Sequence, residues 1–349
     1  MVYKIAKDIG GGDTHQKVII DGNRNLTVDE VRVGTLVNNF FYGSLGVSAS
    51  TGYTIAGITS PTNTRNTIDS FPFASDANAS DVGDTTSVIH FQAGQSSPSH
   101  GYTAGGSTGN PASHSPSNII QRIPFSSNTN ASDVGDLTVN RRGLSGQSSR
   151  SNGYACHGYH DPTTTYYDII DKFPFASDTT NSSDAGDLTQ TRSAGTGTSG
   201  ETHGYVAGGY AVSATSNVIE KFPFASDANG ADVGDLTQGT YSGAGQSSAT
   251  HGYTSGGTTT ANNTGLHSVI DKFPFSSDAN ASDVADLTQA RYLLAGGQSS
   301  ASHGYSSGGY IVPDVNVIDK FTFSADFKAT DVGDLTQARY GTGGAGVQG

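Results

Sequence analysis

Three short motifs recur six times along the chain, and this internal repeat constrains the fold more than any other feature. A Gly-Tyr dipeptide begins at Gly52, Gly101, Gly153, Gly204, Gly252 and Gly304. An Asp-Val-Gly-Asp motif or a close variant begins at Asp81, Asp133, Asp184, Asp232, Asp283 and Asp331. An Ile-Asp-Lys-Phe-Pro-Phe motif or a variant ends at Phe73, Phe125, Phe175, Phe224, Phe275 and Phe323. The chain therefore contains six copies of a unit of about 50 residues, from about residue 34 onwards.

Each unit is predicted to contain four short strands. In the last unit these are residues 291–300, 303–309, 316–323 and 331–337. Val317, Asp319, Phe321 and Phe323 share one face of the third strand, which is the period of two expected of a strand packed on one side. The polar residues between the third and fourth strands, as at 277–282, are typical of turns. The pattern predicts an all-β protein.

Four-stranded units of this length close radially into a β-propeller. An open solenoid, the alternative, would leave exposed sheet edges at both ends. Residues 33–50 resemble residues 332–348, so the chain begins and ends in the same phase of the repeat. We therefore expect one terminal segment to complete the blade that the other begins. The prediction is six blades, with a seventh, partial blade as the alternative.

The repeat also resembles a known family. The sequences Arg-Tyr…Gly-Gly, Gly-Tyr…Gly-Gly and Asn-Val-Ile-Asp-Lys-Phe resemble kelch-type, galactose-oxidase-like propellers over about nine tenths of the chain, although the chain has no Trp. The sequence pattern Phe-Pro-Phe-Ala-Ser-Asp…Asp-Val-Gly-Asp-Leu-Thr-Gln is similar to that of kelch-like proteins of marine phages and their metagenomic relatives. This resemblance implies a protein of a virus particle.

The first 32 residues differ from the repeats. Residues 17–28 alternate like a β-hairpin with a turn at Asp21-Gly22, and they resemble short β segments of phage fibre and baseplate proteins. We predict an N-terminal β attachment segment over residues 1–32 and a propeller of six repeats over residues 33–349.

Composition excludes several classes of function. The chain has 31 Asp and Glu against 18 Lys and Arg, a net charge of −13, which disfavours nucleic-acid binding. Its single Cys excludes an intrachain disulfide. No apolar run approaches the ~18–20 residues of a membrane span, and the start lacks the apolar core of a secretory signal. We expect neither membrane insertion nor a signal peptide.

Two repeated features could bind metal. Residues 76–84 place oxygen ligands at loop positions 1, 3, 5 and 9, which is compatible with calcium. Other copies lose these ligands, at Asn128, Lys328 and Ala231, so an Asx-type turn is the favoured interpretation. The histidines before the Gly-Tyr motif are the second feature, and we expect them to bond a neighbouring blade: His100, His203, His251 and His303. We predict no metal or other cofactor, with calcium as the alternative.

An enzyme is the third possibility for chemistry. Cys156 lies near Tyr154, His157, Tyr159 and His160, which resembles the Cys-crosslinked Tyr of galactose-oxidase-like copper enzymes. The distant Tyr and His ligands of such a site cannot be identified, and a buried thiol is the favoured interpretation. We predict no catalytic residues and no enzyme activity.

Binding is predicted where the units differ, on or beside the loops between the second and third strands. These loops span residues 107–117, 160–166, 210–216, 258–266 and 310–315. The candidate ligand-binding residues are His114, His160, Tyr166, Tyr167, Tyr210 and Tyr310, with His267 beside them. Tyrosine offers rigid amphipathic surface that stacks on sugars or docks on protein.

These observations predict a non-enzymatic structural protein of the phage virion, in a tail fibre or another external appendage. Its expected partners are other virion proteins and a glycan or receptor on the host surface, and a homo-oligomer on the particle is compatible with this role. Two alternatives remain open. One is a purely structural capsid-decorating or tail-assembly module, and the other is a carbohydrate-acting propeller enzyme.

Overall fold

The computed structural model describes residues 50–346, apart from residues 61, 177–180, 261–263 and 295–296, together with two short strands near the N-terminus. Those strands, β1 (Val18–Ile20) and β2 (Leu26–Val28), pair antiparallel, as the predicted hairpin requires. The chain divides into two units, Met1–Gly46 and Val47–Gly349. The boundary predicted between residues 32 and 33 and the turn predicted at Asp21-Gly22 lie outside the described residues.

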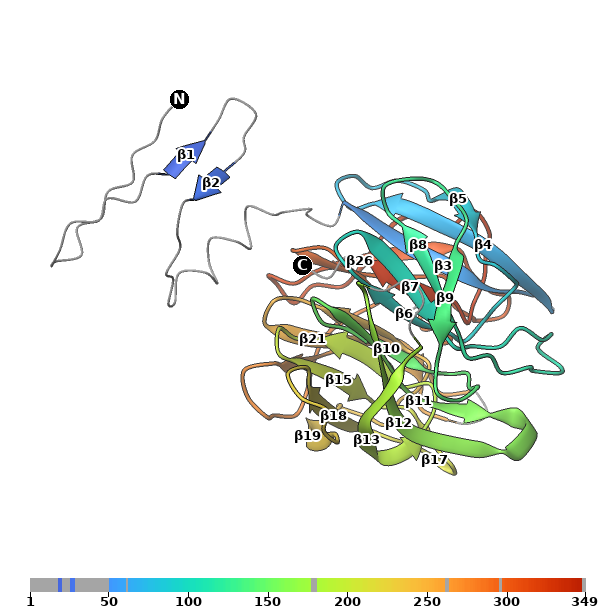
Figure 1. Cartoon of the computed structure of the whole chain (residues 1–349). Helices are drawn as coiled ribbons and strands as arrows, with labels where there is room; N and C mark the ends of the chain where they lie inside the picture. The colour runs from blue at the N-terminus through green and yellow to red at the C-terminus, as the bar shows by residue number, and fades with distance from the viewer. Residues whose placement is uncertain are drawn as a thin grey trace, which may run out of the picture. The chain divides into compact units, whose positions relative to one another are not determined.

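Six antiparallel sheets of four strands form a six-bladed β-propeller, which confirms the predicted fold (Figure 1). Blade 1 consists of β3 (Thr51–Thr59), β4 (Asn63–Pro72), β5 (Ser80–Asp84) and β28 (Gly343–Gly346). Blade 2 consists of β6 (Ala93–Ser96), β7 (His100–Ala104), β8 (Ile119–Pro124) and β9 (Ser132–Asp136). Blade 3 consists of β10 (Ser145–Ser148), β11 (Asn152–His160), β12 (Thr165–Pro174) and β13 (Ser183–Arg192).

The other three blades follow the same plan. Blade 4 consists of β14 (Thr196–Ser199), β15 (His203–Ala207), β18 (Val218–Pro223) and β19 (Ala231–Asp235). Blade 5 consists of β20 (Ala244–Ser247), β21 (His251–Thr258), β22 (Leu266–Pro274) and β23 (Ser282–Asp286). Blade 6 consists of β24 (Gln298–Ser299), β25 (His303–Ser307), β26 (Val317–Thr322) and β27 (Thr330–Asp334). Two loops add the hairpin β16 (Tyr210–Ala211) and β17 (Ala214–Thr215) and the 3-10 helix η1 (Asp161–Thr163).

The C-terminal strand closes the ring. β28 pairs antiparallel with β3, from Gly343 opposite Ile55 to Gly346 opposite Gly52. It is the inner strand of blade 1, whose other three strands come from residues 51–84. This confirms that one terminal segment completes the blade begun by the other. In the described part of the chain, no helix has the length and apolar character needed to cross a bilayer.

Two details of the strand prediction were wrong. The predicted first strand of blade 6, residues 291–300, has strand conformation over Gln298–Ser299, and Leu293 within it adopts a left-handed φ of 53°. In the third strand, β26, Ile318 is as fully buried as Asp319 beside it, although the alternation placed it on the open face. Both faces of the strand are covered because adjacent blades pack on each side.

An aromatic stack joins every blade to the next. The Tyr of the Gly-Tyr motif lies on the last Phe of the next blade's Phe-Pro-Phe or equivalent motif, with ring centroids 4.6–4.9 Å apart. The six pairs are Tyr53–Phe125, Tyr102–Phe175, Tyr154–Phe224, Tyr205–Phe275, Tyr253–Phe323 and Tyr305–Phe73. The preceding Gly leaves room for a ring of its own blade, since a Cβ on Gly304 would lie 2.4 Å from Phe321.

The Asp-rich loops also join neighbouring blades. Asn78 Oδ1 accepts a hydrogen bond from the backbone N–H of Asp334, and four other Asn–Asp pairs repeat this bond. Asp81 Oδ1 accepts the N–H of Gly83, as in an Asx-type turn. Asp76 forms an ion pair with Lys320 of the preceding blade. The loops thus contain the turn that the sequence favoured, and they connect one blade to another.

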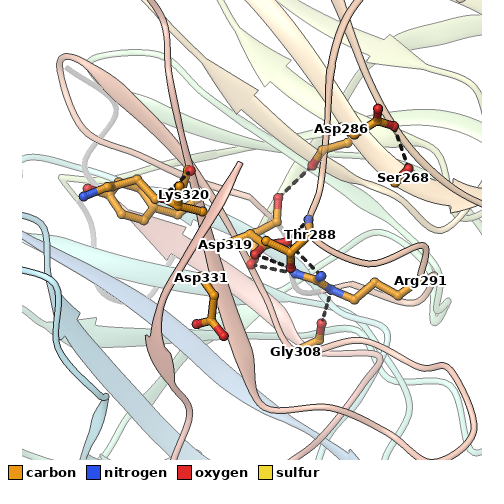
Figure 2. Close-up of polar contacts among 12 residues, drawn as sticks. Ser268, Asp286, Thr288, Arg291, Gly308, Asp319, Lys320 and Asp331 are labelled. Carbon is orange, nitrogen blue, oxygen red and sulfur yellow. Dashed lines mark hydrogen bonds and ion pairs between the residues drawn. The ribbon is translucent and has the colours of Figure 1, made fainter. Parts of the chain in front are cut away.

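A buried ion pair lies inside four blades. Arg291 Nη1 is 2.9 Å from Asp319 Oδ2, and Arg291 Nε donates to the carbonyl oxygen of Gly308 (Figure 2). Thr288 donates to the same carboxylate (Figure 2). The equivalent pairs are Arg141–Asp171, Arg192–Glu220 and Arg339–Asp69. All eight of these side chains are fully buried.

Two blades lack this arginine. In blade 2 the equivalent residues are Ile89 and Gln121, so an apolar and a neutral side chain replace both charges. In blade 5 Thr240 takes the place of the arginine, but the acid remains as Asp271, which is 3% exposed. Burial raises the pKa of Asp271, and hydrogen bonds from Thr237 offset part of that effect.

We predict that Asp319→Asn and Asp271→Asn have unequal effects on stability. Asp319→Asn should lower the free energy of unfolding by about 3–5 kcal/mol, because Arg291 is left charged and unpaired in the core. Asp271→Asn should change it by about 1 kcal/mol or less, because no ion pair is lost. Urea unfolding of both variants measures the difference, and equal losses would contradict the assignment.

The pH dependence gives a second measurement on the same variants. The folded pKa of Asp271 is raised above the ordinary value of 3.8. Its contribution to stability is therefore fully present below that value and is lost as the pH rises through the folded pKa. Wild type should accordingly lose stability relative to Asp271→Asn as the pH rises through this range. A pH-independent difference would contradict the prediction.

Candidate functional site

The loops between the second and third strands of all blades lie on one face of the propeller, which we call the loop face. At this face an isolated bridge in each blade joins a residue preceding the inner strand to a residue at or just beyond the end of the second strand. The pairs are His90–Ser107, Arg142–Tyr159, Ser193–Tyr210, Tyr241–Thr258, Tyr292–Tyr310 and Tyr340–Ile58. These positions carry most of the aromatic side chains of the loop face.

A ring of backbone hydrogen bonds surrounds the propeller axis at this face. The residue after the first member of each bridge is left-handed, with φ between 53° and 67°. These residues are Phe91, Gly143, Ala194, Ser242, Leu293 and Gly341. Five of their N–H groups donate to the carbonyl of the equivalent residue in the preceding blade, at 2.7–2.9 Å. We call this set the axial ring.

Below the axial ring the channel along the axis is narrow, with a volume of about 90 Å³. Glycines of the inner strands account for this, since a Cβ on Gly146 would lie 2.1 Å from the carbonyl oxygen of Gly94. Further along, Ser96 N–H donates to Ser148 Oγ, and the three following pairs repeat the bond. The channel is therefore narrower than the space on its loop-face side.

A wider cavity of about 350 Å³ lies above the axial ring. Part of the axial ring forms its floor, and aromatic side chains form its wall. Besides Gly143, the lining residues are Phe91, Arg142, Tyr159, Tyr166, Ser193, Ala194, Tyr210, Tyr241, Ser242 and Leu293. Neighbouring tyrosine rings are tilted by 46–55°, with centroids 4.7–6.3 Å apart, so they form a continuous curved surface.

Arg142 is held rigidly in this wall. Its Nε and Nη2 donate to the two carboxylate oxygens of Asp161 at 2.7 and 2.6 Å. Its guanidinium carbon lies 5.5 Å from the ring centroid of Phe91 and 5.4 Å from that of Tyr159. Burial alone would raise the pKa of Asp161, but the hydrogen bonds and charge of Arg142 outweigh burial and lower it. Arg142 is therefore positively charged and Asp161 negatively charged, and the pair has no net charge.

Two histidines lie beside Phe91. His90 Nε2 is 3.1 Å from His114 Nδ1, and the His114 ring centroid is 5.8 Å from that of Phe91. Burial lowers the pKa of His90 to about 3 and also lowers that of His114, and the positive charge of Arg142 acts in the same direction. Both imidazoles are therefore neutral at pH 7.

The structure brings only some of the predicted binding residues together. Tyr166 and Tyr210 line the cavity, and His114 lies beside it. Tyr310 belongs to a second aromatic group, packed edge-on against Tyr292 and Tyr340. The remaining candidates lie outside the lining. His160 bonds Thr163, Tyr167 pairs in register with Gly158 and Arg192, and His267 bonds Thr240.

Sequence reasoning missed the other aromatic and charged lining residues, which are Phe91, Arg142, Tyr159 and Tyr241. Three of them lie just before an inner strand, in segments that the repeat marks as structural. An alignment of the six units would have shown the signal, because the position after the buried arginine is occupied by His90, Arg142, Ser193, Tyr241, Tyr292 and Tyr340. This position carries a different kind of side chain in blades 2, 3 and 4, and tyrosine in the other three.

The repeated histidines and Cys156, which the sequence also singled out, contact other residues of the propeller. The Nδ1 atoms of His100, His203, His251 and His303 lie 2.8 Å from the hydroxyl of the preceding residue, in their own blade and not in the neighbouring one. Cys156 is buried and its Sγ donates to Gln147 Oε1, and burial raises the pKa of the thiol. Within the described residues, no group of three or more His, Cys, Asp or Glu side chains is placed to hold a metal ion.

The fold places the chain in the class of six-bladed β-propellers with four-stranded blades. No protein-family model matches the chain, and no curated protein matches its sequence.

The axial ring allows a test of its own geometry. Ala194 and Gly143 occupy equivalent left-handed positions in adjacent blades, at φ 56° and 67°. We predict that Ala194→Gly raises the free energy of unfolding by about 1 kcal/mol or less, because it relieves the left-handed strain at the cost of a more flexible unfolded chain. Gly143→Ala should lower it by a similar amount. Chemical unfolding of the two variants checks this, and shifts of the same sign would argue against the ring.

Proposed function

We propose that this chain is a non-enzymatic binding protein of an external phage appendage, and that its kelch-like propeller binds a glycan on the host surface through the cavity of the loop face. The observation that carries the proposal is the curved wall of Phe91, Tyr159, Tyr166, Tyr210 and Tyr241 above the axial ring. Half-buried aromatic surface of this kind, with polar groups at its edge, is what stacking on sugar rings requires.

The rigidity of the site supports a binding role. The floor is a backbone ring tied to neighbouring blades, and Arg142 is fixed by Asp161 and by two aromatic rings. A preformed site loses little conformational entropy when a ligand binds. Single sites of this kind bind weakly, and display of many copies on a particle would give useful avidity.

Two other functions remain as alternatives. A capsid-decorating or tail-assembly module would use the propeller to bind another virion protein, and Val212 and Val312 offer exposed apolar contacts on the loop face for that purpose. A carbohydrate-acting enzyme would release or oxidise sugar. Firm association with purified virion proteins in the absence of glycan binding would favour the first, and turnover of a polysaccharide would favour the second.

We predict saturable binding of the labelled full-length protein to an array of bacterial lipopolysaccharides and capsular polysaccharides. Tyr210→Ala should weaken this binding at least about tenfold, because a stacked aromatic side chain is a typical hot spot. Tyr340→Ala removes a tyrosine of the same face that packs on Tyr310 outside the cavity, so it serves as the matched control and should bind as wild type.

The array result decides the proposal in either direction. Loss of binding in Tyr210→Ala with retention in Tyr340→Ala supports the cavity as the glycan site. Absence of binding to every polymer on the array, or equal binding by both variants, would overturn it. Circular dichroism and unfolding curves of the variants show that each one is folded.

A further inference from the structure

The charges around the cavity narrow the class of ligand, an inference that rests on the proposed binding function of this site. Among the described lining residues Arg142 is the only cation, and Asp161 occupies two of its three nitrogens. A guanidinium grips an anion through this same two-pronged geometry. An acidic ligand would therefore meet a guanidinium whose charge Asp161 already neutralises.

The hydrogen-bonding groups that remain free are uncharged phenols and the remaining N–H bonds of Arg142. Arg142 Nη1 and the hydroxyls of Tyr159, Tyr166 and Tyr210 make no hydrogen bond within the described part of the chain. Burial raises the pKa of Tyr166, which keeps its phenol neutral. These groups surround apolar ring faces. A sugar ring has the complementary arrangement, with C–H groups on its faces and hydroxyls around its edge.

The size and position of the cavity limit how much of a glycan enters. A volume of about 350 Å³ is at the lower end of ligand pockets, which suits roughly one or two sugar rings. The lining comes from segments of blades 2 to 6, and its tyrosines come from blades 3 to 5 only. Tyr292, Tyr310 and Tyr340 pack on one another. Among the described residues, the tyrosine-lined cavity thus lies on one side of the six-fold repeat.

We infer that the cavity binds one end of an uncharged glycan, and that Asp161 sets this specificity by neutralising Arg142. Asp161 belongs to η1, a turn in the loop of blade 3, whereas Arg142 precedes the inner strand of the same blade. The variable loop thus supplies the negative charge of Asp161, and the segment before the inner strand supplies the positive charge of Arg142. Removal of the acid should convert the same cavity into a site for acidic sugars.

The test uses ligand-observed NMR titration of the full-length protein. The probes are the methyl glycosides of glucose, galactose and mannose, with glucuronic and galacturonic acids as the acidic set. Wild type should bind at least one neutral glycoside at a single site, with an affinity that changes less than about twofold between low and high salt. Asp161→Asn should gain at least about tenfold in affinity for a uronic acid.

Asp314→Asn is the matched control. Asp314 is another carboxylate on a loop of the same face, and it accepts a hydrogen bond from the backbone N–H of Ser60 away from Arg142. Asn retains that acceptor in both variants. The control should leave the affinities for neutral and acidic probes at wild-type values, which separates the effect on Arg142 from a general change in surface charge.

Other outcomes overturn the inference without touching the proposed function. Preference of wild type for the uronic acids would show that Arg142 is available to anions. Array binding that depends on Tyr210, without binding of any sugar probe, would show that the occupant is another part of the polymer. If Asp161→Asn does not fold, the selectivity and salt dependence of wild type still decide the question. Absence of binding to every polymer on the array would instead overturn the proposed function, on which this inference rests.

Discussion

The ring depends on the stack of one tyrosine on the phenylalanine of the next blade. Six blades close only if six such contacts have one geometry, and the closing contact of Tyr305 on Phe73 has a centroid distance of 4.6 Å against 4.8 Å for Tyr53 on Phe125. An error repeated in each contact would accumulate around the ring. The Asn–Asp hydrogen bonds join neighbouring blades at the outer loops, and the hydrogen bonds of the axial ring join them near the axis. Both sets therefore support the same angle between adjacent blades.

The propeller could be predicted from the sequence because its contacts repeat in the sequence. Every Gly-Tyr and Phe-Pro-Phe motif marks one inter-blade contact, and the matching ends of the chain indicated the closure that β28 makes with β3. Strand lengths were less predictable. Residues 291–294 before β24 have the composition of a strand, but Leu293 among them is left-handed, like its equivalents in the axial ring, and such a position is fixed by contacts between blades.

The candidate site was harder to predict because it joins positions that are distant along the chain. Tyr166 and Tyr210 were found as variable loop residues, whereas Phe91 and Arg142 lie in segments that pack the blades. Tyr310 has the loop position of Tyr210, but it packs on Tyr292 and Tyr340. A variable position identifies the correct face of the propeller, and only packing decides which side chains reach one cavity.

Departures from the repeat show how one cavity can arise on a symmetric ring. Ile89 with Gln121 and Thr240 with Asp271 replace the buried ion pair in blades 2 and 5, and both blades keep their four strands. The stacks and loop bonds therefore hold a blade in place when its interior changes. Residues next to the interior arginine position could accordingly diversify blade by blade, into His90, Arg142 and Tyr241 among others. Because the frame is supported between blades, the side chains around the axis are free to differ, and an asymmetric site results.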